Sequence, residues 1–99
     1  MKDNDKMIRF VKNSVADYFN ETHEDMKITP DDVYIVWFSK TIQNFKACAS
    51  YDHPDHMYYE LTFHGDRKEV YMDCYKKIDK RTIPFDTSVD DYNNKWYDK

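Results

Sequence analysis

The residues that come closest to a chemical motif lie in one short run, Asp52–His56, with the sequence Asp-His-Pro-Asp-His. Imidazoles and carboxylates are ligand types that Zn²⁺, Mn²⁺ and Ni²⁺ accept. The spacing argues against a site, because structural sites usually take their ligands from two separate elements and Pro54 marks this run as a turn. We therefore expect a solvated loop without metal or cofactor, and nothing in the sequence brings His23 or His64 to it.

Nucleophilic or acid catalysis has no better support in the sequence. Cys48 and Cys74 fall on the faces of predicted strands amid Ala, Val and Met, where a buried thiol is usually inert. They form no Cys-X-X-Cys motif, and we expect both to be reduced thiols of a cytosolic protein. Adjacent acids such as Asp31-Asp32 and Asp90-Asp91 do not converge on one substrate atom. We therefore predict that the chain is not an enzyme.

The aromatic residues are too numerous to serve only as a hydrophobic core. The chain has nine Tyr, six Phe and two Trp. Five of them are expected in the interior: Trp37, Phe38, Phe45, Tyr59 and Phe63. Three are predicted on the opposite face of the sheet, Tyr58, Tyr71 and Tyr75, with the charged neighbours Glu60, Asp73 and Lys77. Tyrosines flanked by charge are typical of an interface, although cross-strand tyrosine pairs could also simply stabilise this face.

Length and composition narrow the class of protein. A chain of 99 residues normally forms one hydrophobic core. A single Gly excludes Gly-rich phosphate loops, which need glycine at several positions. The net charge of -4, with Lys and Arg scattered among Asp and Glu, disfavours binding to a phosphate backbone. The N-terminus lacks the apolar region of a secretory signal, and no run approaches the roughly 18 apolar residues of a membrane span, so we expect a soluble protein.

The N-terminal half of the chain predicts a helix, a turn and a strand. Apolar residues at helical spacing predict an amphipathic helix over residues 5–20: Met7, Ile8, Val11, Val15, Tyr18 and Phe19. The run Thr29-Pro30-Asp31-Asp32 predicts a single turn before the next strand. From Val33 the run VYIVWFSK is β-branched and aromatic, which predicts a central strand covered on both faces.

Three more strands are predicted by alternating patterns, at residues 45–51, 57–64 and 69–78. In the first of them, Ala47 and Ala49 should let the helix approach the sheet closely. The second should bury Met57, Tyr59, Leu61 and Phe63, and the third Val70, Met72 and Cys74. Between these two strands, Gly65 is expected to supply the positive φ of a hairpin loop.

The predicted fold is α+β. An N-terminal amphipathic helix packs on a four-stranded antiparallel meander sheet and forms a single domain over residues 1–78. Residues 79–99 show no sustained period and are expected to form an extended C-terminal tail. We expect this tail to be ordered only if Ile83, Phe85 and Trp96 dock on the domain.

The chain resembles a family of small, uncharacterised proteins carried by bacteriophages and prophages of Gram-positive bacteria. Two stretches carry the resemblance, DDVYIVWFSKTIQNFKA at residues 31–47 and MYYELTFHGDRKEVYMDCYKK at residues 57–77. The resemblance implies no established activity. It implies a context, since small phage proteins often bind a host or phage protein in the bacterial cytoplasm, and some block a defence nuclease such as a CRISPR effector.

These observations together predict a non-enzymatic, phage-derived protein that binds a host or phage protein in the cytoplasm. Inhibition of a host antiviral nuclease is the most concrete version of this hypothesis. Acids beside tyrosines suit a basic partner surface, including the groove of a nucleic-acid enzyme. The residues predicted to bind the partner are Tyr58, Glu60, Tyr71, Asp73 and Tyr75 on the outer sheet face, and Asp91, Tyr92 and Trp96 in the tail.

Two other hypotheses are open. A nucleic-acid-binding accessory protein of phage replication would need one basic patch beside the tyrosines, built from Lys46, Arg67, Lys68, Lys76 and Lys77. A metal-dependent enzyme would use the Asp52–His56 turn. The sequence does not define the oligomeric state.

Overall fold

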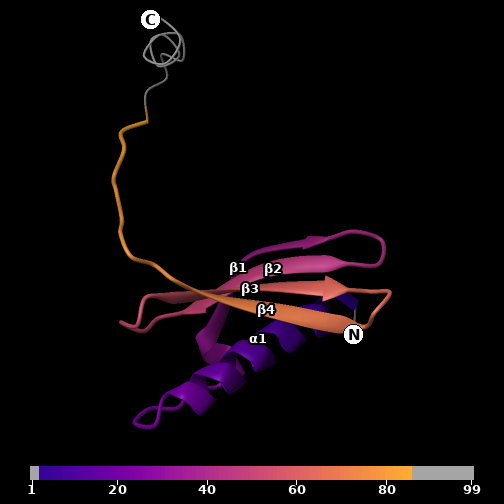
Figure 1. The fold of residues 1–99 in the computed structure, drawn as a ribbon, viewed down its shortest axis with the longest axis horizontal. Coiled ribbons are helices and arrows are strands. Elements are labelled where there is room, and N and C mark those ends of the chain that lie inside the picture. Colours follow the sequence, from indigo (N-terminus) through magenta and orange to yellow (C-terminus); the bar gives the residue numbers. More distant parts are fainter. Residues whose placement is uncertain (1–2, 86–99) are drawn as a thin grey trace, which may run out of the picture.

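The computed structural model describes residues 3–85 and confirms the predicted α+β architecture (Figure 1). One helix lies along one face of a four-stranded antiparallel sheet with the strand order β1-β2-β3-β4, so the predicted meander is also confirmed. The elements in chain order are α1 (Asp3–Thr22), the 3-10 helix η1 (Pro30–Asp32), β1 (Val33–Lys40), β2 (Phe45–Tyr51), β3 (Met57–His64) and β4 (Glu69–Lys76).

α1 packs on the sheet through one apolar stripe. Val11, Val15 and Phe19 recur at helical spacing and are fully buried. They share a core with Ala47 and Ala49 of β2, which are also fully buried. Because these two strand residues carry only a methyl group, the larger helix residues reach the sheet between them, as the sequence predicted.

The prediction that residues 33–40 form a central, doubly covered strand is wrong. β1 is an edge strand, and Tyr34, Val36 and Trp37 are 51%, 54% and 41% exposed. The central strand with low exposure on both faces is β2, where only Lys46 is exposed. Residues that favour β-structure mark a strand, but they do not tell an edge strand from a central one.

A β-bulge in β1 explains why Trp37 is not in the interior as predicted. Ile35 pairs with Ala49 and Trp37 pairs with Cys48, so the register shifts across Val36. The extra residue changes which side chains face the core, and Trp37 therefore points to the face opposite the helix. Bulges of this kind also make an edge strand a poor template for pairing with another chain.

β4 pairs with β3 along its whole length, as predicted, but it buries less than the sequence suggests. Val70 and Met72 are half-buried, whereas Cys74 is exposed and not in the core as predicted. The reason is its place in the sheet, since β4 is the far edge and α1 packs mainly over β1 and β2. The strand ends at Lys76, two residues before its predicted end.

Gly65 has a different role from the predicted one. Its φ is not positive; Lys68 in the same loop takes the left-handed conformation with a φ of 52°. A Cβ atom at Gly65 would instead lie 2.2 Å from the carbonyl oxygen of Gln43. The Gly65 N–H donates to Asn44 Oδ1 over 2.8 Å, so the β1–β2 and β3–β4 loops pack directly on each other at one end of the sheet.

Residues 77–85 continue beyond the sheet as extended chain without regular secondary structure (Figure 1). Ile83 and Phe85 are exposed and do not dock on the domain. Trp96 lies outside the described residues. Within residues 3–85, no helix combines the length and the apolar content needed to span a membrane.

The Gly65 contact generates a stability prediction. Gly65→Ala should lower the free energy of unfolding by about 1–3 kcal/mol, because the new methyl group would collide with the Gln43 backbone and force the two loops apart. Urea denaturation of the purified chain measures this change.

The matched control is Asp66→Ala, which alters the next, exposed residue of the same loop. It should change the unfolding free energy by less than about 0.5 kcal/mol. Equal stability of the Gly65→Ala and Asp66→Ala variants would contradict the assigned loop contact.

Candidate functional site

The face of the sheet opposite α1 gathers five of the residues that the sequence predicted to bind a partner. Strand pairing places Tyr34, Ser50, Tyr58 and Tyr75 side by side across all four strands. We call this surface the outer face. Its members are Tyr34, Trp37, Ser39, Lys46, Cys48, Ser50, Tyr58, Glu60, Thr62, Tyr71, Asp73 and Tyr75.

Tyr58 and Tyr75 are neighbours in the row of Tyr34, Ser50, Tyr58 and Tyr75, which we call the aromatic row. Their rings stack at a centroid distance of 5.1 Å and an interplanar angle of 17°. They remain 39% and 40% exposed, so part of each ring is accessible to a partner. Ser50 beside them is buried and donates to the Met57 carbonyl over 2.8 Å.

Charged groups border the aromatic row. Lys46 Nζ lies 3.2 Å from Glu60 Oε1, and Glu60 pairs with Asp73 across the β3–β4 ladder. Lost hydration, followed by the charges of Glu60 and Asp73, raises the pKa of Tyr75 above its ordinary value. The hydrogen bond that Tyr71 donates to Glu69 over 2.6 Å likewise raises the pKa of Tyr71. Both phenols are therefore neutral hydrogen-bond donors at neutral pH.

The structure brings five of the predicted partner-binding residues onto this one face: Tyr58, Glu60, Tyr71, Asp73 and Tyr75. Asp91, Tyr92 and Trp96 lie outside the described residues. Sequence reasoning missed Tyr34 and Trp37, which extend the aromatic surface onto β1. The alternation within β1 could have indicated Tyr34, but the bulge at Val36 hides the orientation of Trp37.

The five basic residues of the nucleic-acid hypothesis do not form one patch. Lys46 lies on the outer face and is paired with Glu60. Arg67 and Lys68 lie in the β3–β4 loop, at the opposite end of β4 from Lys76. Lys76 also pairs in register with Met57, on the helix side of the sheet, and Lys77 follows it.

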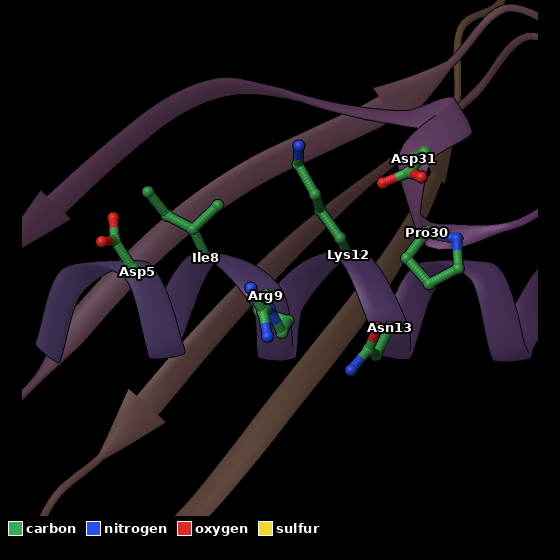
Figure 2. A pocket seen from close by; sticks show the side chains of 7 residues that line it. All are labelled: Asp5, Ile8, Arg9, Lys12, Asn13, Pro30 and Asp31. Atoms are coloured by element: carbon green, nitrogen blue, oxygen red, sulfur yellow. The ribbon is translucent and has the colours of Figure 1, made fainter. Parts of the chain in front are cut away.

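A separate hollow of about 420 Å³ lies between α1 and η1 (Figure 2). Figure 2 shows that its lining combines both signs of charge, from Asp5, Arg9, Lys12 and Asp31, with Ile8, Asn13 and Pro30 between them. The charges in this lining balance, and the lining contains no set of metal ligands. We therefore propose no ligand or reaction for this hollow.

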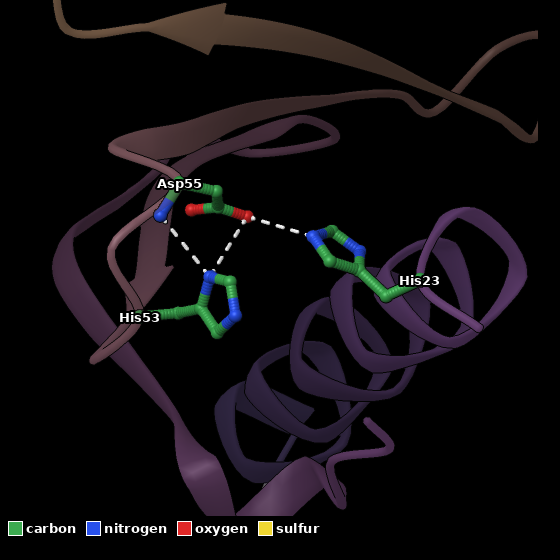
Figure 3. Close-up of side chains that lie close together, drawn as sticks. All are labelled: His23, His53 and Asp55. Carbon is green, nitrogen blue, oxygen red and sulfur yellow. Dashed lines mark hydrogen bonds and ion pairs between the residues drawn. The ribbon is translucent and has the colours of Figure 1, made fainter. Parts of the chain in front are cut away.

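His23, His53 and Asp55 converge between the end of α1 and the β2–β3 turn (Figure 3). We call these three residues the His-Asp cluster. His23 Nε2 lies 3.2 Å and His53 Nδ1 lies 3.5 Å from Asp55 Oδ2. Their side chains are 26%, 20% and 15% exposed, so the expectation of a solvated loop is wrong for His53 and Asp55.

Local packing holds His23 at the turn. Its ring stacks on Phe19, one helical turn earlier, at a centroid distance of 3.8 Å. Lys27 Nζ donates to the carbonyls of Asn20 and His23 over 2.7 and 3.1 Å, which satisfies the open end of the helix. The sequence gives no sign of this meeting, because an i, i+4 pair predicts only that Phe19 and His23 share a side of the helix.

Asp55 is held in place by hydrogen bonds. Its Oδ2 accepts from the Tyr51 hydroxyl over 2.8 Å, and its Oδ1 accepts from the Met57 N–H over 3.1 Å. The other histidines do not join the cluster: His56 is exposed in the turn, and His64 ends β3 at the far end of the sheet. Asp52 is also exposed and outside it.

The chain was compared with known protein families, curated proteins and solved structures. The model of a family described as a family of unknown function, DUF6275, matches residues 8–85, which is most of the chain and includes all four strands. No curated protein and no solved structure matched the chain.

The two thiols provide a test of the exposures assigned to β2 and β4. Cys74 is exposed, whereas Cys48 is buried on the outer face between Trp37 and Glu60. Burial, followed by the charge of Glu60, raises the pKa of Cys48, so less reactive thiolate is present at a mildly alkaline pH. A disulfide reagent should therefore label one thiol quickly in the native protein and the second only after denaturation.

Single variants assign the two phases. Cys74→Ala should remove the fast phase and Cys48→Ala should leave it intact, as measured by absorbance at mildly alkaline pH. A fast phase that survives in Cys74→Ala would contradict the exposures assigned to the two strands.

Proposed function

The chain belongs to the DUF6275 family, whose function is unknown, and we propose that it is a non-enzymatic protein that binds a partner protein through its outer face. The observation that carries the proposal is a surface with exposed aromatic residues on β1, β3 and β4 that no helix of residues 3–85 covers. This proposal extends the predicted site by Tyr34 and Trp37.

The amount of exposed aromatic surface favours an interface over a purely structural role. Five outer-face residues have large aromatic side chains that are 39–51% exposed: Tyr34, Trp37, Tyr58, Tyr71 and Tyr75. Contiguous exposed apolar surface on a small domain marks interaction sites, and Tyr and Trp are enriched at the centres of interfaces. Stabilisation of the sheet accounts for the Tyr58–Tyr75 stack but not for Tyr34 and Trp37, which are exposed on the edge strand.

The charges around the tyrosines favour a basic partner. Lys46 is neutralised by Glu60, which leaves Asp73 and Glu69 as acids without an opposite charge in the ion pairs of residues 3–85. A partner surface with Lys or Arg would complement them. The most specific form of the proposal is a phage-derived inhibitor that acts in the bacterial cytoplasm on the positively charged groove of a host antiviral nuclease.

Nucleic-acid binding is the second candidate. The tyrosines of the outer face could stack bases. Glu69 raises the pKa of Tyr71, and Arg67 acts in the opposite direction with a smaller effect. This hypothesis is less well supported, because Lys76 and Lys77 lie at the other end of β4 from Arg67.

The proposal predicts that removing the Tyr58–Tyr75 stack weakens partner binding while the fold persists. Tyr58→Ala combined with Tyr75→Ala should weaken binding by about 2 kcal/mol or more, roughly 30-fold in Kd, because large buried aromatics dominate interface energetics. The tagged chain is used to capture partners from a bacterial lysate, and the captured protein is then purified to measure its Kd for each variant.

Phe10→Ala is the matched control, since Phe10 is an aromatic residue with 49% exposure on α1, in the other layer. It should bind as the native chain does, and binding of both should weaken with added salt. Equal binding by the control and the tyrosine variant, or the absence of any captured partner, would refute the proposal. Tight binding of single-stranded DNA that requires Tyr58 and Tyr75 would favour the second candidate instead.

A further inference from the structure

We propose that His23, His53 and Asp55 bind a divalent first-row transition metal ion of the Zn²⁺ type. The inference concerns a site on the helix side of the sheet and does not depend on the function proposed for the outer face. The ion would connect the end of α1 to the β2–β3 turn, two elements whose closest residues are 30 positions apart in the sequence.

The spacing of the ligand atoms suits a tetrahedral ion. Zn–N and Zn–O bonds of about 2.0–2.1 Å place neighbouring ligands about 3.3–3.4 Å apart in a tetrahedral shell. In the structure, His23 Nε2 and His53 Nδ1 lie 3.2 and 3.5 Å from Asp55 Oδ2. One donor atom from each of the three residues lies within 4.8 Å of the other two. The three side chains point toward one another, so an ion between them could bind all three (Figure 3).

The hydrogen bonds around His23 leave one of its nitrogens available for an ion. His23 Nδ1 lies 3.0 Å from the Phe19 carbonyl oxygen, while Nε2 faces the Asp55 carboxylate. Both oxygens are acceptors, so a neutral imidazole can satisfy only one of them. The Thr22 hydroxyl also lies 3.0 Å from Nδ1, so a neutral His23 has two arrangements. In one, Nδ1 accepts from Thr22 and Nε2–H donates to Asp55; in the other, Nδ1–H donates to the Phe19 carbonyl and Nε2 is free to bind a cation beside Asp55. Donation from the other ring nitrogen to a backbone carbonyl is the usual support of a metal-ligating histidine.

The other two ligands are also supported. The Asp55 N–H donates to His53 Nδ1 over 3.1 Å, which identifies this nitrogen as the one with the lone pair. A bound ion would compete with that N–H for the lone pair. The Asp55 carboxylate is fixed by Tyr51 and Met57, and such second-shell hydrogen bonds orient ligating carboxylates.

The donor set selects the class of ion. Two imidazoles and one carboxylate suit Zn²⁺ and neighbouring transition metals, whereas Mg²⁺ and Ca²⁺ prefer shells made of oxygen. A hollow of about 270 Å³ opens beside the cluster and is lined in part by His23 and Asp55. It offers room for a water molecule as the fourth ligand.

Titration of the purified, metal-free chain with ZnCl₂ tests the inference. Isothermal titration calorimetry should show saturable binding of about one ion per chain, and Tm should rise by roughly 10 °C at about one hundred times Kd. Co²⁺ in the same site should give the visible absorption bands of a low-symmetry, nitrogen- and oxygen-coordinated ion. MgCl₂ and CaCl₂ at the same concentration should leave Tm unchanged.

Matched variants locate the ion. His53→Asn and Asp55→Asn should each weaken Zn²⁺ binding by at least about tenfold, because each removes one ligand. His56→Asn and Asp52→Asn change the same residue types in the same turn and should bind as the native chain does. Asn is chosen at His56 because it tolerates the positive φ of 61° found there.

The outcomes separate clearly. Loss of the heat signal and of the Tm shift in both ligand variants, with both control variants unaffected, supports the site. The absence of a Zn²⁺-dependent heat in the native chain, or equal binding by native and Asp55→Asn chains, overturns it. In that case a hydrogen bond from His23 Nε2–H to Asp55, without an ion, is the correct description of the cluster.

Discussion

The constraint on which the rest of the structure depends is that a single helix must cover a four-stranded sheet. Val11, Val15 and Phe19 form an apolar stripe along α1 and pack on the small residues of β2. The fully buried core lies along this contact. The helix has only one sheet face to pack against. The other face is then exposed to water or covered by a partner. Aromatic residues on that face therefore indicate an interaction surface, whereas the same residues between two layers would only fill a core.

The same contact produces the His-Asp cluster. Phe19 lies in the core, and the next turn of the helix carries His23 over the β2–β3 turn, where it stacks on the ring of Phe19. On the sheet side, the hydroxyl of Tyr51 reaches Asp55 and also contacts that of Tyr59, a fully buried neighbour on β3. Burial raises the pKa of Tyr51, so its hydroxyl keeps its proton and continues to donate. The cluster is thus positioned by the core itself.

Sequence patterns predicted what depends on local periodicity. The helix, the meander and the faces of β2 and β3 follow from spacings of three to four residues or of two, and the structure confirms them. The predictions were wrong where a contact between residues far apart in the sequence determines the position of a side chain. The edge position and bulge of β1 turned Trp37 outward, and the edge position of β4 exposed Cys74. Gly65 is required by the carbonyl of Gln43, and His23 meets Asp55 only after the helix has docked.

The two candidate sites share one piece of backbone. The Asp55 carboxylate accepts a hydrogen bond from the Met57 N–H. The Met57 carbonyl accepts one from the Ser50 hydroxyl, and Ser50 lies on the outer face next to Tyr58. The β2–β3 turn therefore carries the His-Asp cluster on one side and the start of the aromatic row on the other. An ion bound at the cluster would therefore restrain the turn from which Tyr58 extends, and the Tyr75 ring is stacked on Tyr58. Because an already ordered surface loses less entropy on binding, the metal site and the binding face can be coupled without any change of fold.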